Sequence, residues 1–256
     1  MCDSCGCSGG AAGGHHHHGD DPHYHVHADG TAHSHPSADG GGRSVEVRRN
    51  VLAGNEAVAV ETRKMLDERG IVAVNLISSP GAGKTTLLER TLEALSGEIG
   101  CAVVTGDQRT DNDARRLSGK GAEVAQIETG DACHLNASQV ADSLGDVLGA
   151  GTKLLFIENV GNLVCPVAFD LGEHFKIALL SVAEGEDKPS KYPSLFAAAS
   201  VVALTKMDLL PHLDFDLAAC RKAVRGMRPG AFIFELSAKT GDGMDKWLDY
   251  LRSLVA

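Results

Sequence analysis

The chain has 256 residues, 43% of them hydrophobic, and a formal net charge of −10 at pH 7. This length suits one α/β domain of about 200 residues with an extension, and the acidic balance argues against a nucleic-acid partner. Residues 1–42 contain five aspartates and no lysine or arginine. This segment therefore carries −5 of the total charge and differs in composition from the rest.

No apolar run approaches the roughly 18 residues of a transmembrane helix, and the start of the sequence lacks the basic and apolar segments of a signal peptide. We therefore expect a cytoplasmic protein with no membrane partner. Three of the seven cysteines lie within the first seven residues. In a reducing compartment, such an odd and uneven set indicates metal ligation more than disulfides.

Residues 1–42 predict a disordered tail that binds metal. Thiolates are soft ligands, and three of them in one short loop can reach one ion, whereas the imidazoles that follow suit nickel, zinc and copper. The intervening Gly, Asp, Ser and Pro residues cannot form a packed core. A low-complexity tail without a metal role is the alternative. The candidate ligands are Cys2, Cys5 and Cys7 and, more weakly, His15, His16, His17, His18, His23, His25, His27, His33 and His35.

Residues 43–256 predict a doubly wound α/β domain with an N-terminal helix from Ser44 to Arg69, which Gly70 ends. Short apolar runs then alternate with amphipathic helical patterns, as expected of a mostly parallel sheet buried on both faces. Ligands of such a fold bind at the carboxyl ends of the strands. The expected strands are Val72–Ile77, Cys101–Val104, Glu123–Ile127, Leu154–Ile157, Ile177–Val182, Val201–Leu204 and Phe232–Leu236.

The first run leads into residues 78–86, which read Ser-Ser-Pro-Gly-Ala-Gly-Lys-Thr-Thr. This is the pattern of a nucleotide phosphate loop, although the general pattern begins with Gly, and a chance glycine-rich turn is the alternative. Lys84 would reach the β- and γ-phosphates, and the Thr85 hydroxyl would hold Mg²⁺. The expected nucleotide-binding residues here are Gly81, Ala82, Gly83, Lys84, Thr85 and Thr86.

Acidic residues follow two further strands. Asp107 could hold Mg²⁺ or orient the attacking water, and the polar residues after it would form a switch loop. Glu158 would reach toward Mg²⁺, and the Gly161 N–H could touch the γ-phosphate. Solvated turn residues are the alternative. We predict that Lys84, Asp107 and Glu158 are catalytic and that Thr85, Asp107 and Glu158 are the Mg²⁺ ligands.

Two motifs after later strands favour guanine. Residues 205–208 read Thr-Lys-Met-Asp, which looks like the guanine-reading Asn-Lys-x-Asp motif with Thr in the first position. Asp208 would accept from guanine N1–H and the 2-amino group, and adenine would leave this acceptor unpaired at a cost of roughly 1–3 kcal/mol. Residues 237–239, Ser-Ala-Lys, resemble the loop that contacts the guanine oxygen. The predicted base-binding residues are Thr205, Lys206, Asp208, Ser237, Ala238 and Lys239.

A second metal site is expected within the domain. Cys133 and His134 stand just before a helix that Asn136 would cap, and Cys165 continues the loop that would sense the γ-phosphate. A buried cysteine is otherwise most often a small apolar filler. Two thiolates and one imidazole leave a fourth position open, or filled by a second chain.

With both metal clusters and the GTPase motifs in view, the chain resembles the HypB family of nickel-insertion GTPases of hydrogenase maturation, which belong to the SIMIBI class of P-loop GTPases. The resemblance spans residues 44–256 and the Met-Cys-x-x-Cys-Gly-Cys start. Its most specific stretches are residues 78–86, 106–116, 158–173 and 184–193. This family commonly reads Ser-Ser-Pro-Gly at the start of the phosphate loop.

The resemblance implies a Mg²⁺-dependent GTPase that hydrolyses GTP to GDP and helps to place nickel into [NiFe]-hydrogenase precursors. It implies a homodimer and, as partners, an accessory protein of the HypA family and the hydrogenase large-subunit precursor. By position, Cys2, Cys5 and Cys7 would form the tight nickel site. Cys133, His134 and Cys165 would form a nickel or zinc site, and the histidines would store nickel. A urease-type or other metallochaperone GTPase, or mainly a nickel buffer, is the alternative.

Overall fold

The computed structural model describes residues 24–26, 32–34, 40–108 and 112–256. The chain divides into two units at Ala53/Gly54, and each is described by itself. The first unit contains strands β1 (Tyr24–Val26) and β2 (Ala32–Ser34), paired antiparallel with His25 opposite His33, and the beginning of helix α1 (Gly40–Glu68). The sequence patterns did not predict these two strands. The predicted domain boundary between residues 42 and 43 falls inside α1 and stays a prediction.

The second unit is built on a seven-stranded sheet in the order β5-β4-β6-β3-β7-β8-β9. Every pair of neighbours is parallel, so the predicted doubly wound α/β class is confirmed. All seven expected strands are present, with ends that differ by a few residues. They are β3 (Val72–Ile77), β4 (Gly100–Asp107), β5 (Ala122–Glu128), β6 (Thr152–Glu158), β7 (Phe175–Ser181), β8 (Ala199–Thr205) and β9 (Phe232–Glu235).

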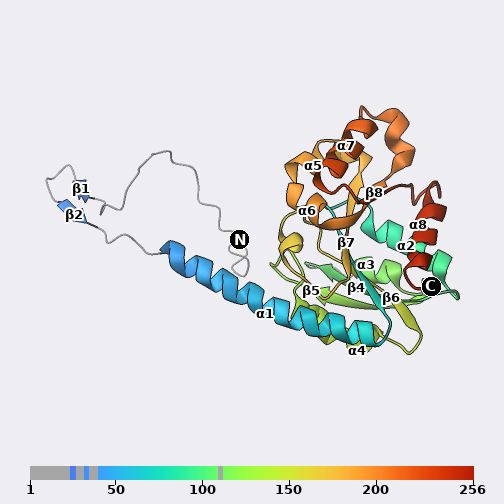
Figure 1. Ribbon diagram of the computed structural model, residues 1–256, viewed down its shortest axis with the longest axis horizontal. Coiled ribbons are helices and arrows are strands. Elements are labelled where there is room, and N and C mark those ends of the chain that lie inside the picture. The colour runs from blue at the N-terminus through green and yellow to red at the C-terminus, as the bar shows by residue number, and fades with distance from the viewer. Residues whose placement is uncertain (1–23, 27–31, 35–39, 109–111) are drawn as a thin grey trace. The chain divides into compact units, whose positions relative to one another are not determined.

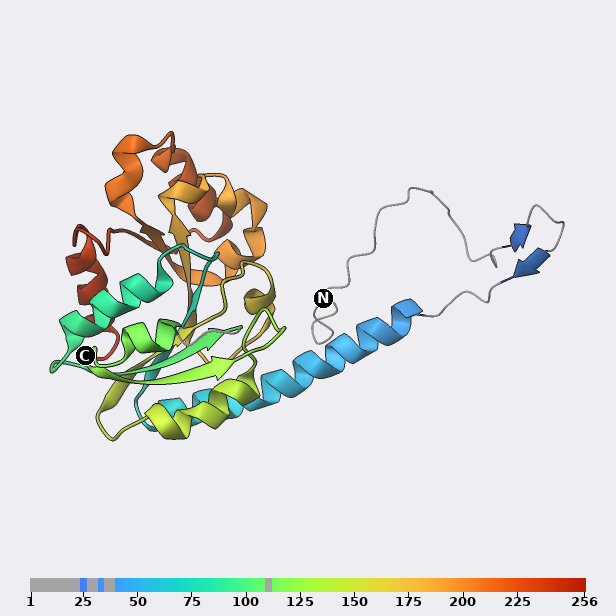
Figure 2. The same cartoon turned by 180° about the vertical axis from the view of Figure 1, so that it is seen from behind.

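Helices cover both faces of this sheet (Figures 1 and 2). One face packs against α2, α3 and α8, and the other against α6 and α7 and, toward the β4 and β5 edge, α4. The helices are α2 (Lys84–Leu95), α3 (Asn112–Leu117), α4 (Ala137–Val147), α5 (Lys188–Lys191), α6 (Pro193–Ala198), α7 (Leu217–Met227) and α8 (Met244–Ser253); η1 (Cys165–Ala168), η2 (Val182–Glu184) and η3 (Met207–His212) are 3₁₀ turns. Among the helices of the described residues, none is long and apolar enough to cross a membrane.

The α2–α8 face shows how packing fixes the phosphate-loop helix. Trp247 of α8 is fully buried, and its indole N–H donates to the Thr91 hydroxyl of α2 at 2.9 Å. Thr91 in turn donates to Leu87 O at 2.7 Å. Because a buried indole N–H without a partner would cost roughly 1–3 kcal/mol, this contact fixes how the two helices lie on the sheet.

Strand β3 lies at the centre of the sheet, between β6 and β7. Its carboxyl end leads through the phosphate loop into α2, and the carboxyl ends of β4 and β6 lie beside it. Parallel strands bring such ends to one edge of a sheet. The residues predicted from three separate motifs therefore meet at one place.

Candidate nucleotide and metal site

A cleft of about 620 Å³ opens at this edge of the sheet. Seven of the predicted nucleotide-binding residues line it, the predicted catalytic residue Lys84 among them, together with the two other predicted catalytic residues. Gln108, Asp113 and Arg116 of the predicted switch loop also line it, as do Pro80 and Val160, to which the sequence analysis gave no role. The predicted residues in the lining are Gly81, Gly83, Lys84, Thr85, Thr86, Asp107, Glu158, Gly161 and Lys206. We call this space the nucleotide cleft.

The phosphate loop turns at Gly83, which has a φ of 98° and stands at the N-cap of α2. A side chain would be strained in this left-handed conformation, which explains the glycine. Lys84 begins the helix and donates through Nζ to Ser78 Oγ at 3.0 Å. Burial lowers the pKa of Lys84. A lysine of this kind, beside the first N–H groups of a helix, is suited to bind phosphate oxygens.

Thr85 and Glu158 meet at the floor of the cleft, where the Thr85 hydroxyl donates to Glu158 Oε1 at 2.8 Å. Glu158 is 2% exposed, and its Oε2 is buried without a hydrogen-bond partner among the described residues. Burial raises the pKa of this carboxyl to about 7. An unpaired buried carboxylate oxygen is costly, and a hard cation with oxygen ligands would satisfy it. The donor set of Thr85, Glu158 and Asp107 therefore fits Mg²⁺.

Arg116 of α3 brings a further cation to the cleft. Its guanidinium donates to Thr86 Oγ1 at 3.0 Å and forms an ion pair with Glu89 of α2. Arginine binds phosphate oxygens through two parallel donors. The predicted switch stretch 106–116 included this residue, but spacing alone did not single it out from Arg115, which does not line the cleft.

The two guanine motifs lie together beside the phosphate loop. Lys206 is in the left-handed conformation, with a φ of 58°, and its Nζ donates to Gly81 O at 2.7 Å. The Thr205 hydroxyl donates to Ala82 O at 2.7 Å. Ser237 Oγ donates to Asp208 Oδ1 at 2.6 Å. Ala238 follows and accepts a bond from Arg90 at 3.3 Å, and the Lys239 side chain is exposed.

Glu184 forms a hydrogen bond with Ser79, near the start of the phosphate loop. Glu184 lies in η2 and accepts hydrogen bonds from the Ser79 hydroxyl and from the N–H of Ser181, the last residue of β7, at 3.2 Å. Lys188 pairs with the same carboxylate at 3.9 Å. The stretch 184–193 was distinctive in the sequence but had no assigned role. Its first residue holds Ser79.

The loop after β6 connects the cleft to a second group of side chains. Gly161 passes so close to the phosphate loop that a Cβ there would lie 3.0 Å from Pro80 Cα. Asn162 Oδ1 then accepts the N–H groups of Val164 at 2.7 Å and Cys165 at 3.3 Å. This turn places Cys165 at the start of η1.

Cys133, His134 and Cys165, which we call the metal cluster, offer ligand atoms that all lie within 4.8 Å of one another. Cys133 Sγ is 3.9 Å from His134 Nδ1. Tetrahedral ligands at 2.0–2.3 Å from an ion stand roughly 3.3–3.8 Å apart, so a small contraction would close three of them around one ion. The structure thus brings together the three residues that the sequence analysis proposed as a metal site.

The ring of His134 is held in place by stacking on Phe169, with centroids 3.9 Å apart. His134 is 4% exposed, and burial lowers its pKa. A lowered pKa keeps the imidazole neutral, which is the form that binds metal. Cys101 and Cys220 are buried in the sheet and in α7.

Most of the predicted metal ligands of the tail lie outside the described part of the chain. Cys2, Cys5 and Cys7 lie outside the described residues, and so do the tail histidines except His25 and His33, whose backbones form part of β1 and β2.

Comparison with known proteins shows the family to which the chain belongs. Residues 72–235 match the family model described as CobW/HypB/UreG, nucleotide-binding domain. The hydrogenase maturation factor HypB of Escherichia coli strain K12 is 49% identical over 211 residues, which is 82% of this chain and 73% of that protein.

Two solved structures are similar along most of the chain. HypB from Archaeoglobus fulgidus superposes with a TM-score of 0.75 at 37% identity, covering 80% of this chain and all of that one. HypB from Helicobacter pylori in complex with nickel superposes with a TM-score of 0.74 at 38% identity, covering 79% and 95%.

Proposed function

Because the chain belongs to the HypB hydrogenase maturation factors, within the CobW/HypB/UreG family of nucleotide-binding proteins, we propose that it is a nickel-binding GTPase of [NiFe]-hydrogenase maturation. It hydrolyses GTP to GDP and phosphate, and its metal cluster receives nickel for a hydrogenase precursor. Zinc is the alternative occupant of the cluster, and the tail supplies a tight site at Cys2, Cys5 and Cys7 with a histidine-rich store. The protein acts in the cytoplasm as a homodimer, with an accessory protein of the HypA family.

The proposal rests mainly on one short segment, residues 158–165, which joins the two sites. Glu158 stands at one end of it, in the nucleotide cleft, and Cys165 stands at the other, in the metal cluster. A change at the γ-phosphate that moves this segment also moves a metal thiolate. Binding of nucleotide and of nickel are then coupled, and the coupling must be reciprocal.

The residues of the cleft have distinct roles in hydrolysis. Lys84 and the N–H groups of the phosphate loop hold the β- and γ-phosphates, while Asp208 and Lys206 hold the base. Thr85, Glu158 and Asp107 would hold Mg²⁺, which when bound neutralises charge that develops on the phosphate oxygens. The Gly161 N–H would contact the γ-phosphate. Water attacks the γ-phosphorus and the bond to the β–γ bridging oxygen breaks, leaving GDP and phosphate.

Two measurements test the proposal. The purified protein should hydrolyse GTP in the presence of Mg²⁺ at a slow rate, on the order of 10⁻⁴–10⁻² s⁻¹ without an activating partner, and Lys84→Ala should abolish this activity. Nickel affinity of the metal cluster should differ between the GDP form and the form with a non-hydrolysable GTP analogue. Equal affinities in the two forms would refute the coupling.

A nickel buffer with a vestigial GTPase makes the opposite prediction in cells. In that case Lys84→Ala would leave hydrogenase activity intact, and deletion of residues 1–42 would abolish it. Co-purification with a urease precursor instead of a hydrogenase precursor would favour the urease-type alternative.

A further inference from the structure

The loop that carries Cys133 and His134 is fastened to β4, the strand that ends at Asp107. At the start of the loop, the Thr129 N–H donates to Asp107 O at 2.9 Å. At its end, the fully buried Leu135 lies against Gly106, where an added Cβ would come within 2.7 Å of Leu135 Cγ. In a close-packed interior, this loop cannot move relative to β4 without repacking Leu135.

Asn159 fastens the same loop to β6. It follows Glu158 directly and is 1% exposed. Its Oδ1 accepts the Leu135 N–H at 3.2 Å and the Val160 N–H at 3.0 Å. One side-chain oxygen therefore joins the residue after His134 to the segment that begins at Glu158.

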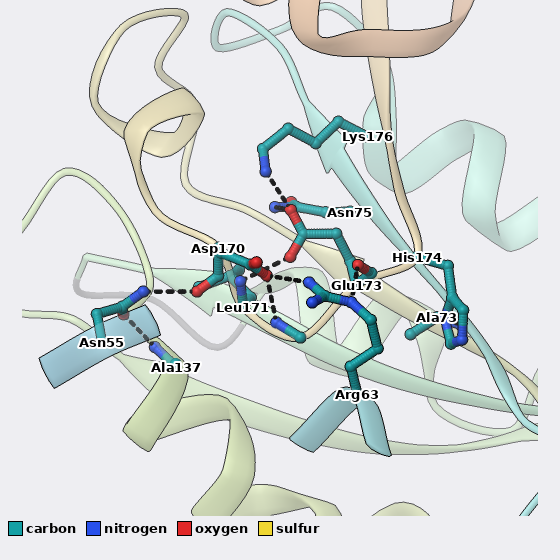
Figure 3. A network of polar contacts seen from close by, with 11 residues as sticks. Asn55, Arg63, Ala73, Asn75, Ala137, Asp170, Leu171, Glu173, His174 and Lys176 are labelled. Carbon is teal, nitrogen blue, oxygen red and sulfur yellow. Dashed lines mark hydrogen bonds and ion pairs between the residues drawn. The ribbon is translucent and has the colours of Figure 1, made fainter. Parts of the chain in front are cut away.

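A second layer of polar groups fixes the Asn159 amide. Its Nδ2 donates to Asn75 Oδ1 at 3.3 Å, and Asn75 Nδ2 donates to Glu173 Oε1 at 3.3 Å. Glu173 is 4% exposed, accepts the Leu171 N–H at 2.6 Å and pairs with Lys176. Figure 3 shows Asn75, Glu173 and Lys176 pointing toward one another. A buried amide whose donor and acceptor are both engaged does not rotate freely.

We propose that Asn159 is a positioning residue that couples the nucleotide cleft to the metal cluster, a role that rests on the proposed function of both sites. Any nucleotide-dependent shift of Glu158 moves the next residue with it, and Asn159 Oδ1 passes the shift through Leu135 to His134. The contact of Leu135 with Gly106 adds the strand of Asp107 to the same junction. The same oxygen accepts the Val160 N–H, so the segment that leads through Gly161 to Cys165 also starts at this junction, and all three ligands respond to the cleft.

An amide that only supports the fold would behave differently. Its loss would lower the stability and affect nickel binding equally in both nucleotide states. A coupling residue instead changes the ratio of nickel affinities between the GDP and GTP-analogue states. This ratio is the quantity to measure.

The experiment uses the full-length chain, because the tail also holds cysteines and histidines. Nickel at buffered free concentrations protects Cys133 and Cys165 from alkylation, and peptide mass spectrometry reads these two sites apart from the tail. The half-protecting nickel concentration is measured with Mg²⁺ and either GDP or a non-hydrolysable GTP analogue.

Three variants are compared with the wild type. Asn159→Ala removes the bridge, and Gly106→Ala displaces Leu135 from the other strand. Asn55→Ala is the matched control, because Asn55 also makes two amide hydrogen bonds, to Asp170 O at 2.7 Å and from the Ala137 N–H at 2.8 Å. Figure 3 shows these two bonds, and no hydrogen bond of the described residues joins the Asn55 side chain to β6 or to Leu135.

The wild type should show a ratio of about fivefold or more between the two states. Asn159→Ala should bring this ratio close to one, Gly106→Ala should reduce it, and Asn55→Ala should keep it. A wild-type ratio that persists in Asn159→Ala, with both nucleotides and nickel still bound, would overturn the role of Asn159. If Asn159→Ala binds no nucleotide, an undiminished ratio in Gly106→Ala overturns the junction. A ratio of one in the wild type refutes the proposed coupling itself.

Discussion

Ser237 Oγ donates to Asp208 Oδ1 at 2.6 Å, so a hydrogen bond between side chains joins the two motifs that favour guanine. The Met207 N–H also donates to Leu236 O at 3.2 Å, which ties the same two loops through their backbones. Asp208 is thereby held with its second oxygen free of this bond. A preorganised acceptor loses less conformational freedom when it binds.

Asp208→Asn should weaken GTP binding roughly 10- to 100-fold, because an amide presents a donor where the base presents its own N–H groups, at a cost of about 1–3 kcal/mol. ATP binding should change little. Isothermal titration with both nucleotides measures this. Asp242→Asn is the control, since Asp242 is exposed and, among the described residues, its side chain bonds only the Thr240 hydroxyl. Equal losses for GTP and ATP would contradict the role in base recognition.

Arg116→Ala should weaken binding of a GTP analogue roughly tenfold or more and weaken GDP binding less. Its guanidinium lies at the phosphate end of the cleft, and a charge-assisted hydrogen bond contributes about 1.5–3 kcal/mol. Fluorescent-nucleotide titrations give both constants. Arg115→Ala, on the same short helix but outside the lining of the cleft, should leave both unchanged. Identical affinities in Arg116→Ala and the wild type would show that Arg116 does not contact phosphate.

Glu184→Ala should weaken GTP and GDP binding by a similar factor, roughly tenfold. The carboxylate holds Ser79 at the start of the phosphate loop, so its loss allows the loop to leave the geometry that both nucleotides require. Glu186→Ala is the control. It removes a nearby carboxylate that makes no hydrogen bond to the phosphate loop among the described residues, so this variant should bind both nucleotides normally. A selective loss of GTP in Glu184→Ala would mean that Glu184 acts near the γ-phosphate instead.

Alkylation should separate the four cysteines of the second unit into two classes. Burial raises the pKa of Cys101 to about 12 and that of Cys220 to about 11, and only the thiolate reacts. At pH 8 both are protonated and react slowly, and their rates should rise only as the pH approaches those values. The partly exposed Cys133 and Cys165 should react first, and nickel should protect them. Fast labelling of Cys101 at pH 8 would contradict its burial.

Much of the fold could be predicted because local pattern and tertiary environment agree. The apolar strands of a parallel sheet are recognisable as continuous runs, and Asn136 with Gln139 forms the capping box that begins α4. The pair β1 and β2 could not be predicted, since three-residue strands among Gly and His residues show no hydrophobic periodicity. Helix α1 extends to Gly40 through three consecutive glycines, where helix propensity argues against a helix.

The position of a side chain at the carboxyl end of the sheet could be predicted wherever a motif follows a strand, as for Lys84, Glu158 and Asp208, whose roles stay predictions. It was not predictable where a residue acts through its neighbours. Asn159 looks like an ordinary loop residue in the sequence, and only the fold brings it to Leu135, 24 positions earlier. The sequence could not show that Arg116 rather than Arg115 lines the cleft, because it does not give the direction in which α3 presents each side chain.

Lys206 is the one non-glycine residue with a positive φ in the described part of the chain. Such a backbone costs roughly 1–2 kcal/mol for a side chain of this kind, and a glycine would relieve it. The Lys206 ammonium donates to Gly81 O, a bond that a glycine would lose, and we propose that the lysine stem also covers the base. Selection for a more heat-resistant version of this protein should therefore favour replacement of Lys206 by glycine. Any gain in melting temperature from this change should be accompanied by a lower affinity for guanine nucleotides.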